Sequence, residues 1–161
     1  MRNAYVIAAS ILLLSINTVK GQTPSENKKV ALRYIEEVIN NRKLDLMGEV
    51  FAEKFLRHDL LDSTEKIKTV ADQKRDIGNL IKAFPDLYYV IGDIMAEGDK
   101  VVVQAVFHGT HRGTFMGVEP SGNRIDYLSE IFFFRIQNGK IVERWLQLDL
   151  YNFFKKMKGE K

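Results

Sequence analysis

The sequence predicts an α+β fold in which three helices come first and a curled antiparallel sheet follows. Apolar residues recur with a helical period up to Phe84 and alternate with polar ones from Leu87 onward. The later segments are separated by short turn sequences, including Asn138-Gly139, a dipeptide typical of a type I′ hairpin. Helices followed by antiparallel strands define the α+β class, and 161 residues suit one domain.

The helical part is expected to consist of three amphipathic segments. Their apolar stripes lie within residues 29–39, 44–51 and 67–84. Ser25 is the expected N-cap of the first segment, and Ser63 or Thr64 is that of the third. Pro85 ends the third helix because proline lacks a backbone donor. Residues 55–63 are expected to form a loop.

The sheet part is expected to contain four long strands. They cover residues 87–96, 100–111, 124–136 and 140–150. A glycine-dense loop over residues 112–123 separates the middle two, Gly109 marks a β-bulge, and a short helix follows the last strand. A twisted sheet that closes over helices forms a cone, and the open mouth of a cone is a natural ligand site.

The N-terminal segment has the pattern of a secretory signal peptide over residues 1–21. Arg2 precedes an apolar run at residues 4–16, and small residues stand before Gln22, the expected new terminus. The run is shorter than the about 20 residues of a membrane-spanning helix, with an uncleaved anchor as the alternative. We therefore expect a secreted or periplasmic protein without stable membrane insertion after processing.

Composition excludes several classes of function. Without Arg2 and Lys20, the 24 basic residues become 22 against 21 acidic ones, so a nucleic-acid partner has no support. The chain has no cysteine, which removes disulfides, thiol catalysis and cysteine zinc sites. Residues 22–28 are polar and predict a short leader before a single domain at residues 29–158.

The last strand carries the only tryptophan, Trp145, and a late carboxylate, Asp149. Strict alternation places both on one face of this strand, together with Ile141 and Glu143. A carboxylate at the rim of an apolar cone has a raised pKa and is suited to acid/base work. The alternative is that Asp149 caps the terminal helix and Trp145 packs in the core.

The three histidines are His58, His108 and His111. Three histidines are enough for a zinc site. However, His108 and His111 are three positions apart in a strand and point to opposite faces, unless the Gly109 bulge turns one of them. We therefore expect no metal, and favour histidines that line the pocket or the surface.

Glu130 lies in an aromatic strand and shares a face with Leu128, Phe132 and Phe134. A carboxylate on such a face is either paired with an arginine or placed to meet a ligand. The candidate partners are Arg124, Arg135 and Arg144. Tyr127 is expected on the opposite face.

The chain resembles the SnoaL-like polyketide cyclase (ester cyclase) family of the nuclear-transport-factor-2-like superfamily. The matching pieces are FLRHD at 55–59, FPDL at 84–87, AEGDKVVV at 96–103, GTHRGTFMG at 109–117, PSGNRI at 120–125 and GKIVERW at 139–145. The resemblance implies the α+β cone and an intramolecular aldol cyclisation of polyketide esters without metal or cofactor. A pocket carboxylate acts as the acid/base in that reaction.

One departure from the family falls in the last strand. Members commonly read His-Trp-Asp where this chain reads Arg144-Trp145-Leu146, so leucine stands at the position of the cyclase acid. Leucine cannot transfer a proton, which leaves Asp149 or Glu130 as the substitute.

Two hypotheses follow. In the first, an exported enzyme acts on a small hydrophobic carbonyl compound, and in the second a non-catalytic module binds such a molecule in the same cone. The expected catalytic residues are Asp149 and His111. The expected ligand contacts are His58, Trp145, Glu130, Tyr127 and Phe115. A homodimer is compatible with either hypothesis, because sheets of this superfamily often pair.

Overall fold

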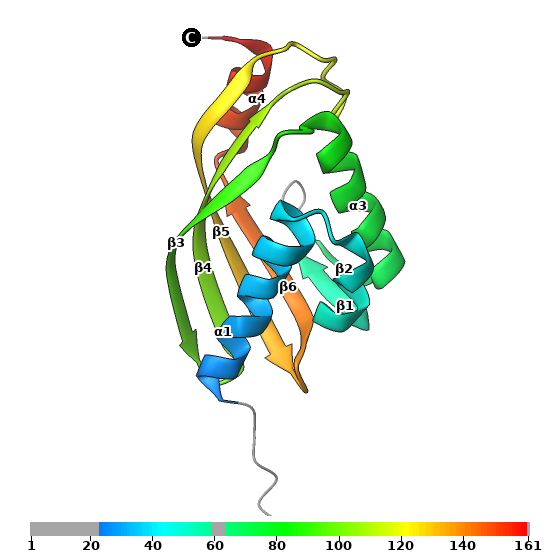
Figure 1. The fold of residues 1–161 in the computed structure, drawn as a ribbon, viewed down its shortest axis with the longest axis vertical. Coiled ribbons are helices and arrows are strands. Elements are labelled where there is room, and N and C mark those ends of the chain that lie inside the picture. The colour runs from blue at the N-terminus through cyan, green and yellow to red at the C-terminus, as the bar shows by residue number, and fades with distance from the viewer. Residues whose placement is uncertain (1–22, 59–63, 161) are drawn as a thin grey trace, which may run out of the picture.

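The computed structural model of the chain describes residues 23–58 and 64–160 (Figure 1). Its helical elements are α1 (Pro24–Arg33), the π-helical η1 (Tyr34–Asn40), the 3-10 turn η2 (Leu44–Leu46), α2 (Met47–Val50), α3 (Val70–Ala83) and α4 (Leu150–Lys158). Its strands are β1 (Phe51–His58), β2 (Glu65–Thr69), β3 (Tyr88–Glu97), β4 (Lys100–Thr110), β5 (Arg124–Gln137) and β6 (Lys140–Leu148).

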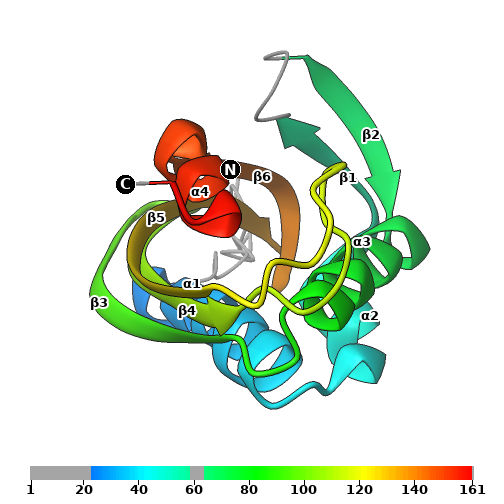
Figure 2. The same ribbon diagram turned by 90° about the horizontal axis from the view of Figure 1, so that it is seen from above.

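The strands form one curled sheet in the order β2-β1-β6-β5-β4-β3, which confirms the α+β class. All neighbouring pairs are antiparallel except β1 and β6, which are parallel. The helix α1 crosses the concave side of the sheet, and α4 lies at one end of the curl (Figures 1 and 2). The four strands expected from the sequence pair antiparallel as predicted, and the parallel pair involves β1, which the sequence did not predict.

The first helix starts earlier than expected. Thr23, not Ser25, is its N-cap, because the Thr23 side chain accepts from the backbone of Glu26 and the Glu26 carboxylate accepts in return. Residues 24–28 are thus helical, although a leader was expected there, and Asn27 is buried. The expected signal peptide at residues 1–21 lies outside the described residues.

The segment after α2 differs most from the expectation. Residues 51–58 and 65–69 pair as strands, although the sequence predicted a helix end, a loop and the start of a helix. The helix α3 begins only after Thr69, which forms a reciprocal capping box with Asp72. Ile67, expected in the core, is consequently 74% exposed on the edge strand. Pairing with β6 is a long-range contact, and such contacts override local propensity.

Two local predictions are confirmed in the sheet. The register of β4 and β5 shifts between Phe107 and Gly109, which is the expected bulge. Asn138 and Gly139 have φ angles of 51° and 75°, as a type I′ turn requires. Within the described part of the chain, no helix is long and apolar enough to cross a membrane.

Candidate active site

The concave face of the sheet carries the candidate site. Leu128, Glu130, Phe132 and Phe134 alternate along β5 and are all buried, which confirms that they share a face. Across the strand pair, Glu130 lies opposite Leu148, Phe132 opposite Leu146 and Phe134 opposite Arg144. Residues opposite one another point to the same side of an antiparallel sheet, so Leu146 and Arg144 also face inward.

A register shift in β6 turns Arg144 inward. Ile136 pairs with Ile141, whereas Arg135 pairs with Glu143, so one extra residue is inserted between these pairs. An inserted residue reverses the alternation that follows it. Ile141 is therefore buried while Trp145 lies on the outer face, and the expectation that they share a face is wrong.

Glu130 has the environment of an acid/base group. It is 4% exposed, and the Tyr89 hydroxyl donates to its Oε2 over 3.0 Å. Burial raises the pKa of Glu130 to about 7, against the opposing effects of the Tyr89 hydrogen bond and the Arg144 charge. A carboxyl group with this pKa populates both of its protonation states at neutral pH.

Arg144 is buried without a full set of partners. It is 8% exposed, and its guanidinium lies 5.9 Å from the centre of the Phe132 ring. Its Nε has no hydrogen-bond partner among the described residues. Its pairing with the inward-facing Phe134 places Arg144 on the same face as the acid, and its charge acts on Glu130, Tyr34 and Tyr89.

A second polar pair faces the same interior. The Gln73 amide on α3 donates to the Tyr34 hydroxyl on η1 over 2.6 Å, and both side chains are buried. The Oε1 of Gln73 has no partner within the described chain. Burial raises the pKa of Tyr34, while Arg144 and the Gln73 hydrogen bond lower it. Buried polar atoms without partners are rare and call for water or a ligand.

His111 and Phe115 form a separate group near α4. His111 is fully buried, its ring stacks on Phe84 at 5.2 Å, and its Nδ1 lies 3.2 Å from the Ser121 hydroxyl. Its Nε2 lacks a partner among the described residues. Phe115 meets Phe84 edge-on at 5.6 Å, so the predicted site residues His111 and Phe115 pack on the same ring. Neither of them is a hydrogen-bond partner of Glu130.

His58 and Trp145 also lie together, but on the outer face. Their rings stack at 4.2 Å, and Trp145 stacks on Phe133 at 4.5 Å. The Nε2 of His58 lies 2.8 Å from the Glu143 carboxylate. Because Trp145 pairs with Phe133, beside inward-facing Phe132, these rings line the outside of the cone and not its interior.

Asp149 and Tyr127 are surface residues. The Asp149 carboxylate accepts from the Asn152 backbone over 2.9 Å and caps α4, so the helix-cap alternative describes its place. Tyr127 is 82% exposed on the face opposite Glu130, as expected.

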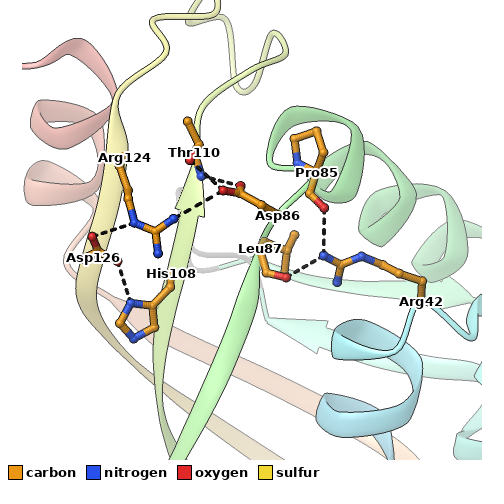
Figure 3. A network of polar contacts seen from close by, with 8 residues as sticks. All are labelled: Arg42, Pro85, Asp86, Leu87, His108, Thr110, Arg124 and Asp126. Carbon is orange, nitrogen blue, oxygen red and sulfur yellow. Dashed lines mark hydrogen bonds and ion pairs between the residues drawn. The ribbon is translucent and has the colours of Figure 1, made fainter.

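His108 belongs to a network that ties the end of α3 to the sheet (Figure 3). Its Nδ1 lies 2.8 Å from the Asp126 carboxylate, Arg124 bridges Asp126 and Asp86, and Asp86 accepts from the backbone and hydroxyl of Thr110. On the other side of Asp86, the Arg42 guanidinium donates to the carbonyls of Pro85 and Leu87. Each histidine thus has a different set of partners, and the three are not assembled at one point.

A pocket of about 300 Å³ opens at the end of the β3–β4 hairpin. It is lined by Met95, Ala96, Glu97, Lys100, Val102 and Phe133. None of the predicted site residues lines it.

Tyr89, Tyr34 and Gln73 were missed in the sequence. Tyr89 alternates with Leu87, so the period of its strand contained the signal. Gln73 is a polar residue four positions before Ile77 on the buried side of α3, a pattern that marks a buried amide. Tyr34 required knowledge of the π-helical turn that brings it inward.

The fold and the Tyr89–Glu130–Arg144 cluster define a class of protein: a curled α+β cone with a carboxyl group in its apolar interior. The chain belongs to the SnoaL-like polyketide cyclase family, whose model matches residues 29–157. This confirms the family that the sequence motifs indicated.

Solved structures agree with this assignment. A protein of Jannaschia sp. CCS1, named as a SnoaL-like polyketide cyclase, is 25% identical with a TM-score of 0.76, over 87% of this chain and 98% of that one. A protein of Acidithiobacillus ferrooxidans, named as a polyketide cyclase, has the same fold at 22% identity and a TM-score of 0.74, over 87% and 99%. No curated protein matches the chain.

Proposed function

We propose that the protein is an exported acid/base catalyst that acts on a small hydrophobic carbonyl compound without a cofactor, and that Glu130 carries the proton. The supporting observation is the position of Glu130. It lies on the concave face, diagonal to Leu146 on the neighbouring strand, where the family resemblance places the cyclase acid. The proposed acid therefore lies on β5, one strand away from the family's acid position on β6, and it faces the same interior.

The proposed reaction is an intramolecular aldol addition. The Glu130 carboxylate removes a proton from the carbon next to a carbonyl group, and the resulting enolate carbon attacks a second carbonyl carbon of the same molecule. The new alkoxide then takes the proton from the Glu130 carboxyl, which restores the starting state. Tyr89 orients the carboxylate through its hydrogen bond to Oε2, and the apolar walls exclude competing water.

The test compares Glu130→Gln with Glu143→Gln. Glu143 is the matched control, because its carboxylate lies on the outer face of the sheet in an ion pair with Arg135. Deuterium exchange next to the carbonyl of 1,3-diketones and β-keto esters, followed by NMR, reports the first step. We expect Glu130→Gln to lower the rate by about 10²–10⁴-fold, the usual share of a general base, and Glu143→Gln to retain it.

Two results would contradict the assignment of Glu130. An unchanged rate in Glu130→Gln would remove its role, and loss of rate in Asp149→Asn with intact folding would give the role to Asp149. Intact mass of protein recovered from the envelope of an expressing bacterium tests export, with Gln22 as the expected first residue.

A non-catalytic binding module is the second candidate, and Leu146 at the family's acid position favours it. The same assay separates the two. Saturable ketone binding with no exchange above the buffer rate in the wild-type protein would establish the binding module and exclude the enzyme.

A further inference from the structure

The interior of the cone contains a buried cation whose hydrogen-bonding capacity is not filled. Arg144 is 8% exposed, and its Nε has no partner in the described part of the chain. The charge of Arg144 lowers the pKa of Glu130, yet no hydrogen bond or ion pair joins these two side chains. A buried guanidinium is costly unless it is paired, so this arrangement favours an additional anion.

Other arginines of the same sheet show the contrast. Arg135, on the outer face of β5, donates to Glu143 over 2.7 Å and contacts Asp99 at 3.4 Å. Arg124 donates to Asp126 over 2.9 Å and to Asp86 over 3.4 Å. These side chains are more exposed than Arg144 and still have protein carboxylates as partners. Of these three arginines of the sheet, Arg144, which faces the candidate active site, is the one to which the described residues supply no carboxylate partner.

We infer that Arg144 anchors an oxyanion of the ligand, and that the ligand is a hydrophobic carboxylic acid rather than a neutral ester. This inference rests on the proposed function for its location, since the same interior holds Glu130. The guanidinium fork fits the planar carboxylate, with Nε as one of its donors. Phe132 and Leu146, which share this face, contact the apolar part of the ligand.

The position of Glu130 indicates whether the anionic group of the ligand is a carboxylate or a phosphate. A phosphate monoester carries up to two charges near neutral pH, and Glu130 faces it from the neighbouring strand. A carboxylate carries one charge, so the neighbouring Glu130 carboxylate repels it less than it repels a doubly charged phosphate. A singly charged carboxylate therefore fits the cluster better than a phosphate.

The experiment measures binding of octanoate, methyl octanoate and octyl phosphate to the purified protein by calorimetry. We expect octanoate to bind at least about tenfold more tightly than its methyl ester, the size of one charge-assisted hydrogen bond. Equal affinities would overturn the inference. Tighter binding of octyl phosphate than of octanoate would overturn the assignment of a carboxylate.

Variants locate the effect. Arg144→Gln should remove the preference for octanoate, Arg144→Lys should keep part of it, and the matched outer-face variant Arg135→Gln should leave it unchanged. A preference that survives in folded Arg144→Gln would contradict the anchor. If Arg144→Gln fails to fold, a preference in Arg144→Lys equal to that of the wild type would show that Nε plays no part.

Glu130→Gln separates this inference from the proposed function. If this variant still prefers octanoate to methyl octanoate but has lost exchange activity, the Arg144 anchor and the catalytic role of Glu130 are both supported. If it keeps both the preference and the activity, the proposed role of Glu130 fails while the anchor stands. If the activity depends on Glu130 but octanoate has no advantage over its ester, the anchor alone fails.

Discussion

The two faces of the sheet handle their polar groups in different ways. On the outer face, the Glu143 carboxylate forms hydrogen bonds with Arg135 and His58. The Asp126 carboxylate does so with Arg124 and His108. On the concave face, the buried Arg144 retains an Nε without a partner in the described chain. A network in which every polar group has a partner stabilises the fold, whereas a buried group without a partner has hydrogen-bonding capacity left for an added molecule.

Truncating neighbouring phenylalanines should give the largest difference between the faces. Phe134 is fully buried against Tyr34, whereas Phe133 is half-buried and stacks on Trp145. We expect Phe134→Ala to lower the free energy of unfolding by about 3–5 kcal/mol, because it leaves a core cavity. Phe133→Ala should cost clearly less in the same urea titration, and equal losses would contradict the inner and outer assignment.

The pH dependence of stability should carry the signature of Glu130. Tyr89 on β3, Arg144 on β6 and Tyr34 on η1 are the titratable or charged groups that act on it or respond to it. Burial raises its pKa from 4.5 to about 7, so the folded state keeps a proton that the unfolded state loses. The contribution of Glu130 to the free energy of unfolding is therefore fully present below pH 4.5, and it is lost as the pH rises through about 7.

The size of this effect is about 3 kcal/mol, from 1.36 kcal/mol per pKa unit. Urea unfolding of the wild type and of Glu130→Gln across this pH range gives the measurement. We expect the wild type to lose stability relative to the variant as the pH rises. A difference that does not change with pH would show that the Glu130 pKa is not raised.

Removing one hydroxyl group should also cost more stability on the concave face than on the outer face, although both losses are smaller. Tyr34→Phe leaves the buried Gln73 amide without its acceptor and should cost about 1–3 kcal/mol of unfolding free energy. The control is Ser129→Ala, since Ser129 accepts from Gln104 on the exposed face, where water replaces it. Thermal unfolding of both variants tests the difference, and an equally large loss in Ser129→Ala would contradict it.

The smallest expected effect concerns Asp149. Asp149→Ala should lower stability by about 1 kcal/mol because it removes the N-cap of α4, while Asp149→Asn should retain the cap. Neither variant should change the exchange rate, as the carboxylate lies at the surface. Loss of activity in Asp149→Asn at unchanged stability would move the acid from Glu130 to Asp149.

Much of the architecture follows from local sequence. The change of period at Leu87, the Asn138-Gly139 turn and the alternation along residues 124–136 predicted the strands β3 to β6 and the face that Glu130 shares with Leu128, Phe132 and Phe134. These features depend on backbone preferences and on alternation within one strand, so neighbouring residues are sufficient to determine them.

Tertiary structure decided the remainder. The strand at residues 51–58 exists through its pairing with β6, and the bulge in β6 sends Arg144 inward and Trp145 outward. The partners of Glu130 come from β3 and β6, which are distant in sequence. Strand register and the raised pKa of a buried carboxyl depend on which segments meet, and no single segment contains that information.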